Sequence, residues 1–109
     1  MKREWSNKWR VGNVVPGECY VYMLEFDGGG YYVGHSDNIR ARLVDHDNNE
    51  CKGTAGKEYW FRYFERWPDR VAAVNREKEL KELLRKNKRA IRDMLIRFED
   101  LVKELDWDK

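Results

Sequence analysis

Two runs of strand-forming residues on either side of a glycine turn constrain the fold more than any other feature of the chain. The runs are CYVYMLEF (residues 19–26) and YYVGH (residues 31–35), both rich in β-branched and aromatic side chains. The segment DGGG (residues 27–30) separates them, and glycine adopts the positive φ angles that a tight reversal requires. We therefore predict an antiparallel β-hairpin.

The residues after the hairpin change from strand to helical period. Ile39 and Leu43 recur at four-residue spacing, and Ser36 or Asp37 is the expected N-cap of this helix. Residues 48–58 then have the composition of a loop. The hairpin is thus followed by a short helix and a long connection.

A third strand and a helical region complete the chain. YWFRYFERW (residues 59–67) alternates as a strand does and ends at Pro68. Beyond Asp69, an expected N-cap, apolar residues recur at helical spacing in two stripes. Between the stripes, LRKNKRA (residues 84–90) is either a joint between two helices or a polar patch on one long helix. These elements predict an α+β fold, a three-stranded antiparallel sheet flanked by three or more helices with an extended C-terminal helix.

The composition is that of a soluble globular domain. Charged residues make up 39% of the 109 residues, but Trp, Tyr and Phe make up 14%, which is too aromatic for a disordered chain. The net charge of +2 means that attraction to nucleic acid must come from local clusters. Cys19 and Cys51 form no CxxC pair, which disfavours a metal finger or a disulfide framework. The chain has no signal-peptide pattern and no apolar run of about 20 residues, so we expect a cytoplasmic or nucleoid-associated protein without a membrane span.

Polar and aromatic side chains collect around the hairpin and the helix after it. Tyr32 and Gly34 share one face of the second strand, as alternation requires, and Tyr22 lies on the first strand. Arg42 and His46 are four residues apart and so share one side of the helix. A guanidinium binds phosphate oxygens with its planar fork, while a phenol or imidazole can position or deprotonate water. The set predicts a site that acts on a phosphodiester.

In its motifs, the chain resembles the GIY-YIG endonuclease superfamily. YVY (residues 20–22) stands where GIY is expected, with tyrosine in place of the first glycine, and YVG (residues 32–34) stands for YIG. Arg42 falls where the family places its catalytic arginine. DRVAAVNREKELKEL (residues 69–83) resembles the segment that carries the family's metal-binding glutamate, and Glu77 takes that place. The resemblance implies one nuclease domain over residues 1–109, with a core at about residues 18–90 and a C-terminal helical extension at 91–109.

This resemblance implies metal-dependent hydrolysis of DNA. Glu77 and water would hold Mg²⁺ or Mn²⁺, although Glu79 and Glu82 lie nearby as alternatives. Arg42 would neutralise charge on the non-bridging phosphate oxygens. Tyr32 is the first candidate for the general base, with Tyr22 and His46 as alternatives; a free phenol has a pKa of about 10 and needs nearby positive charge to favour the phenolate. The expected catalytic set is Tyr22, Tyr32, Arg42, His46 and Glu77.

Basic residues outside this set are candidates for contacts with the DNA backbone. Such contacts supply affinity that depends on salt and not on sequence, although a charge run on a helix is as often a solvated face. The candidates are His35, Arg40, Lys52, Lys57, Arg85, Lys86, Lys88 and Arg89. The C-terminal extension is open to packing, homodimer formation or binding of a targeting partner.

The predicted function is therefore that of a DNA endonuclease, either structure-selective or nicking, with branched or single-stranded DNA as candidate substrates. A non-catalytic nucleic-acid-binding or scaffold module with the same fold is the alternative. A nuclease directed at RNA is a third hypothesis.

Overall fold

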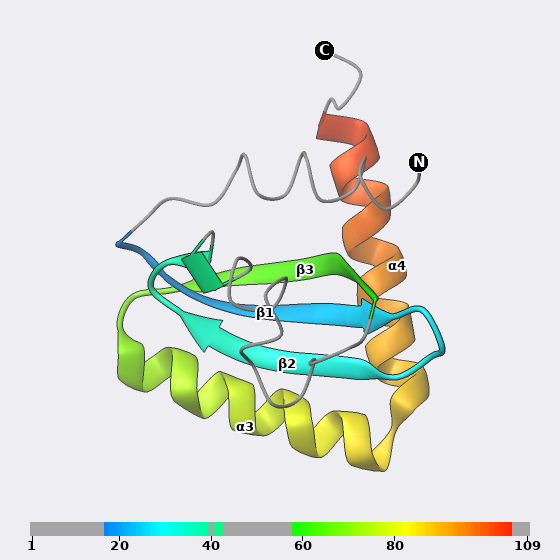
Figure 1. The fold of residues 1–109 in the computed structure, drawn as a ribbon, viewed down its shortest axis with the longest axis horizontal. Coiled ribbons are helices and arrows are strands. Elements are labelled where there is room, and N and C mark those ends of the chain that lie inside the picture. The colour runs from blue at the N-terminus through cyan, green and yellow to red at the C-terminus, as the bar shows by residue number, and fades with distance from the viewer. Residues whose placement is uncertain (1–16, 40, 43–57, 106–109) are drawn as a thin grey trace.

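The centre of the fold is an antiparallel sheet of three strands in the order β2-β1-β3 (Figure 1). The strands are β1 (Cys19–Phe26), β2 (Tyr31–Ser36) and β3 (Tyr59–Trp67). The computed structural model describes residues 17–39, 41–42 and 58–105. β1 and β2 pair antiparallel, which confirms the predicted hairpin. Gly29 and Gly30 have φ angles of 95° and 92° in the turn between them, as expected from the use of glycine there.

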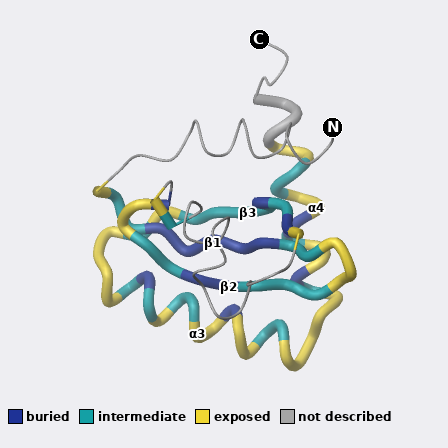
Figure 2. Tube along the Cα trace, viewed as in Figure 1, coloured by how far each residue is buried: buried dark blue, intermediate teal, exposed yellow. Residues whose placement is uncertain are grey.

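Each face of the sheet carries its own apolar cluster. On one face, Tyr20, Tyr22 and Leu24 of β1 pack with Ile39, Tyr59 and Phe61; we call this the tyrosine face. On the other, which we call the helix face, Val21, Met23 and Val33 pack with residues of the two helices, namely Ala73, Leu80, Ile91 and Leu95. Figure 2 shows that β1 is buried along most of its length, whereas the helices are buried only in part. Alternation along β1 thus divides the domain into two cores.

Two helices follow β3, and a joint separates them. Asp69 caps α3 (Arg70–Lys86), since its side chain accepts a hydrogen bond from the Ala72 N–H at 2.8 Å. Asn87 ends α3 by donating its N–H to the Leu83 carbonyl, and its side chain accepts from the Ala90 N–H at the start of α4 (Lys88–Leu105). One asparagine therefore caps both helices, and the first of the two sequence interpretations, a joint, is correct.

The number of helices differs from the expectation of three or more. In the part of the chain that the structure describes, α3 and α4 are the two helices of which both ends are seen. A helical turn begins at Ile39, but the expected cap is wrong: Asn38 holds this turn, accepting from the Ala41 N–H with its side chain and from the Arg42 N–H with its carbonyl. The remainder of that predicted helix lies outside the described residues.

The C-terminal helix α4 packs beside β3 and confirms the predicted long helix. The ring of Phe98 contacts Tyr63 at a centroid distance of 4.9 Å and Phe64 at 5.4 Å, each edge to face. These two residues point to opposite faces of the sheet, so α4 covers the edge of β3 (Figure 1). Neither α3 nor α4 is long and apolar enough to cross a membrane.

Candidate active site

A histidine of β2 and a glutamate of α3 form the polar contact at the centre of the site. Alternation places His35 on the helix face, on the same side of β2 as Val33. Its Nδ1 lies 2.5 Å from Oε1 of Glu77, at the start of the third turn of α3. The side chains are 29% and 15% exposed, so the carboxylate is the more shielded of the two. Glu77 is therefore a half-buried acid that faces an edge strand of the sheet.

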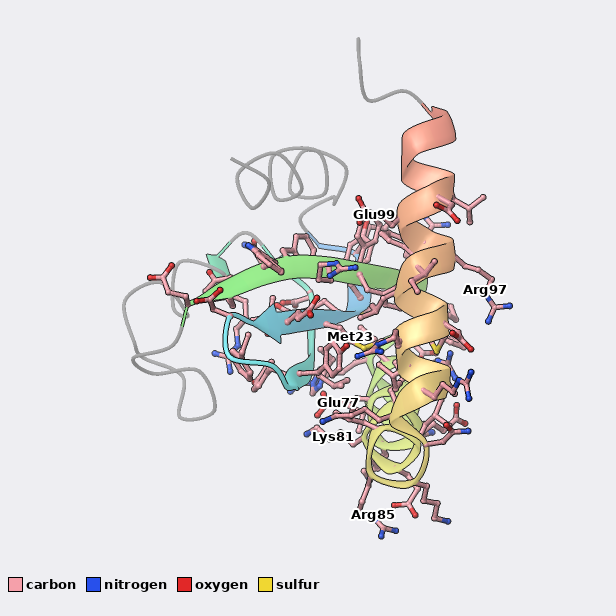
Figure 3. The ribbon with its side chains drawn as sticks, turned by 90° about the vertical axis from the view of Figure 1, so that its right-hand side faces the viewer. Met23, Glu77, Lys81, Arg85, Arg97 and Glu99 are labelled. Atoms are coloured by element: carbon pink, nitrogen blue, oxygen red, sulfur yellow. The ribbon has the colours of Figure 1, made fainter. Side chains whose placement is uncertain are left out.

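Lys81 lies one turn further along α3 and binds the other oxygen of the same carboxylate. Its Nζ is 2.5 Å from Oε2 of Glu77, and Figure 3 shows the two side chains close together on one side of α3. Burial, the largest single influence, favours the neutral acid, but hydrogen bonds from Lys81 and His35 outweigh it and hold the pKa of Glu77 below its usual value. The carboxylate is thus ionised at neutral pH.

A pocket of about 400 Å³ lies where β2 ends and α3 begins. It brings together residues from β1, β2, the following helical turn and the first turn of α3, and two of the predicted site residues, His35 and Arg42, are among them. The described residues that line it are Cys19, His35, Ser36, Asp37, Arg42, Arg70 and Ala73. Arg42, His35 and the Glu77 bound to it are therefore neighbours at this end of the sheet.

The two motif tyrosines form a separate group on the tyrosine face. The rings of Tyr22 and Tyr32 lie 6.2 Å apart between centroids, and Tyr22 also meets Phe61 at 6.3 Å. A Cβ atom at Gly34 would stand 2.9 Å from Tyr22 Cζ and from Tyr32 Cε2. The motif glycine is thus required because both rings occupy the space where a side chain would lie. The rings of Tyr22 and Tyr32 thus lie beside Gly34 on one face of the sheet, and Glu77 lies on the other face.

A second acid, Glu65, fixes α3 to β3. Glu65 accepts two hydrogen bonds of 2.9 Å from Arg76, one from Tyr63 and one from Trp67. Burial is the largest influence on Glu65 and favours the neutral form, but these bonds outweigh it and lower the pKa of its carboxyl. Sequence reasoning missed this network. The sequence did contain a signal for it: Tyr63, Glu65 and Trp67 alternate along the third strand and therefore share one of its faces.

The remaining sequence candidates fall into two groups. Glu79 and Glu82, the alternatives to Glu77, bind arginines of their own helix: Glu79 accepts from Arg76, and Glu82 from Arg85. Lys86 also pairs with Glu82 at 3.0 Å, while Lys88 and Arg89 are exposed at the start of α4. Four predicted residues lie outside the described part of the chain, namely Arg40, His46, Lys52 and Lys57.

The donor set around Glu77 fits a hard divalent cation held partly by water. Within the described residues, no three His, Cys, Asp or Glu side chains gather in a way that would enclose a metal ion. Mg²⁺, however, is usually bound by one or two carboxylates together with waters and substrate phosphates. A single ionised carboxylate beside a pocket that contains an arginine meets that requirement.

Comparison with known families identifies the domain. The profile described as the GIY-YIG catalytic domain matches residues 18–90, which include all three strands and α3. The chain belongs to the GIY-YIG family. GIY-YIG membership gives it a catalytic domain of the nuclease type, for which DNA is the implied substrate.

Several relatives of this GIY-YIG protein share the name UPF0213. The Halobacterium salinarum protein is 30% identical over 74 residues, which cover 66% of this chain and 96% of the relative. The Natronomonas pharaonis protein is 35% identical over 71 residues, covering 63% and 84% respectively. The solution NMR structure of a UPF0213 protein from Bacillus halodurans is 26% identical, covers 71% of this chain and 84% of its own, and superposes with a TM-score of 0.47.

Proposed function

We propose that this GIY-YIG protein is a metal-dependent DNA endonuclease and that its active site is the pocket between the end of β2 and the start of α3. One observation carries the proposal: Arg42 and His35 line the same pocket, and His35 is bound to the ionised carboxylate of Glu77. A guanidinium, an imidazole and a carboxylate are the groups that phosphodiester hydrolysis uses.

Each group has a distinct task in this proposal. Arg42 binds the non-bridging oxygens of the phosphate and stabilises the charge that grows on them. Glu77 and water would hold Mg²⁺ or Mn²⁺, which would polarise the phosphate as a Lewis acid. His35 uses Nδ1 for Glu77, and its Nε2 is then directed to a phosphate oxygen or to the attacking water. The general base is proposed to be one of four residues: His35, which lines the pocket, His46, and the tyrosines Tyr22 and Tyr32, whose rings lie on the other face of the sheet from Glu77.

The size of the pocket supports selectivity for DNA structure. A pocket of about 400 Å³ is large enough to receive a single backbone linkage. The net charge of +2 adds little general attraction to double-stranded DNA. We therefore propose that the substrate is a nick, flap, branch or single strand, in which one linkage is accessible from several sides.

A cleavage assay with matched variants tests the function. Labelled single-stranded, nicked, branched and plain duplex DNA, and an RNA panel, are incubated with the protein in Mg²⁺, in Mn²⁺ or in chelator. We expect metal-dependent cutting that Arg42→Ala and Glu77→Gln reduce at least 100-fold (an order-of-magnitude figure for lost electrostatic stabilisation). Arg92→Ala, an exposed arginine of α4, is the control and should leave the rate unchanged. Circular dichroism establishes that each variant is folded.

Other outcomes assign other functions. DNA binding without cleavage, equal in wild type and in the Arg42 and Glu77 variants, would support the non-catalytic binding module. Cutting confined to RNA would make the protein a ribonuclease. Among Tyr22, Tyr32, His35 and His46, the general base is the residue whose replacement removes cleavage while DNA binding is kept.

A further inference from the structure

Arg70, the first residue of α3, is a pocket residue to which the proposed mechanism gives no task. It is exposed and lines the pocket together with Arg42. Four other arginines of the described chain are paired with carboxylates, the pairs being Arg62–Glu25, Arg66–Glu18, Arg76–Glu65 and Arg85–Glu82. Arg70 makes no ion pair within the residues that the structure describes. Its guanidinium is therefore available to a ligand.

The charge of the pocket favours an anion. Among the described residues that line the pocket, Arg42 and Arg70 are cationic and Asp37 is acidic, and the ionised carboxylate of Glu77 beside the pocket is already bound by His35 and Lys81. Asp37 lies in the turn after β2 and is exposed to solvent. Since guanidinium groups match phosphate oxygens in geometry as well as in charge, two arginines at one pocket are suited to phosphate groups of a nucleic-acid backbone.

The position of Arg70 on α3 gives the direction of that backbone. Arg70 and Glu77 are seven residues apart, which is close to two full turns, so they share one side of the helix about 10 Å apart along its axis. On this side Glu77 contacts His35, which lines the same pocket as Arg70. A strand that passes from Arg70 to Glu77 therefore runs along α3 and crosses the pocket.

We propose that Arg70 binds a phosphate adjacent to the one that is cleaved, so that the DNA strand lies along the β2 side of α3. The inference rests on the proposed function, since it places the scissile linkage between Arg42 and Glu77. Arg97 of α4 is not part of this path. Figure 3 shows Arg97 on the side of α4 that points away from Glu77 and Lys81. Arg92 is likewise exposed on α4 and makes no ion pair with any described residue.

Binding of single-stranded DNA in chelator tests this path without cleavage. Arg70→Gln and the control Arg92→Gln remove one positive charge each, from different helices. By fluorescence anisotropy, we expect Arg70→Gln to weaken binding about tenfold, the order of one charge-assisted contact, and Arg92→Gln to weaken it less than about twofold. The slope of log affinity against log salt should decrease by about 0.7 in Arg70→Gln, as one lost phosphate contact predicts for a single strand.

A scan with uncharged linkages locates the phosphate. Single methylphosphonates are placed along the DNA, and the loss of affinity is measured for wild type and for Arg70→Gln. At the phosphate that Arg70 contacts, the two losses should not add, because the same interaction is removed twice. We expect this position at a linkage next to the cleaved bond, and we expect Arg92→Gln to be additive there.

The outcomes separate this inference from the proposed function. Equal weakening by Arg70→Gln and Arg92→Gln, or additivity at every linkage, overturns the α3 path even if wild type cleaves DNA. Non-additivity near one linkage in a protein that never cleaves supports the path and refutes the nuclease. A wild type that binds no DNA overturns both.

Discussion

Replacing Gly34 by alanine should destabilise the protein because two tyrosine rings occupy the space for the new methyl group. The added Cβ would lie 2.9 Å from Tyr22 Cζ and Oη and from Tyr32 Cε2, which is closer than carbon atoms approach without repulsion. Tyr22 is 0% exposed and also contacts Phe61, so its ring is enclosed by the core. Overpacking of this kind costs about 1–3 kcal/mol. For a chain of this length, each kcal/mol corresponds to about 5 °C in melting temperature.

The measurement is urea unfolding followed by circular dichroism, with Gly28→Ala as the control. Gly28 is exposed in the β1–β2 turn, and a Cβ there would have no atom within 4 Å. We expect the free energy of unfolding to decrease by about 1–3 kcal/mol in Gly34→Ala and by less than about 0.5 kcal/mol in Gly28→Ala. Equal stability of the two variants would refute the explanation of the motif glycine by ring packing.

Three further predictions concern the ion pairs of Glu65 and Glu77. Arg76→Leu removes two hydrogen bonds from a half-buried carboxylate, so the free energy of unfolding in urea should decrease by about 2 kcal/mol, and an unchanged midpoint would contradict the role of Glu65 in holding α3. The pKa values of Glu65 and Glu77 are below the ordinary value of 4.5, so the stability that these carboxylates contribute is complete above that pH and is lost as the pH falls through their folded-state pKa values. Glu65→Gln should therefore weaken the pH dependence of stability in acid unfolding curves. A steeper pH dependence in this variant would contradict the prediction. Lys81→Gln frees Oε2 of Glu77 and should raise the affinity for Mn²⁺ at least about twofold, as measured by calorimetry. Glu77→Gln is the control that should not bind the cation. A lower affinity in Lys81→Gln would show that Lys81 assists cation binding.

The strands could be predicted from sequence because their signals are local. Glycines at positive φ separate β1 from β2, and Pro68 follows the end of β3, so the predicted strand ends agree with the structure to within one residue. The cap of the turn after β2 was harder, since Ser36, Asp37 and Asn38 are all good cap residues and only the hydrogen bond from the Ala41 N–H selects Asn38. Asn87 gave no clear signal because it ends one helix and begins the next without glycine or proline.

The candidate site depends on contacts that no local pattern contains. Alternation along β2 could have placed His35 on the opposite face from Tyr32 and Gly34, and that signal was available in the sequence. Its partner Glu77 is 42 residues away, however, and the contact exists only because α3 crosses beneath the sheet beside β2. The resemblance to GIY-YIG endonucleases indicated Glu77, whereas Arg70 and Lys81 emerged only from the packing of α3.

Neighbouring residues of α3 hold the two outer strands: Arg76 binds Glu65 of β3, and Glu77 binds His35 of β2. Successive residues of a helix point 100° apart, so both attachments depend on the number of residues between the Asp69 cap and Arg76. Adding or deleting a single residue there would rotate both side chains away from their strands at once. The length of this segment is therefore constrained more strongly than the identity of its exposed residues, such as Val71 and Asn75.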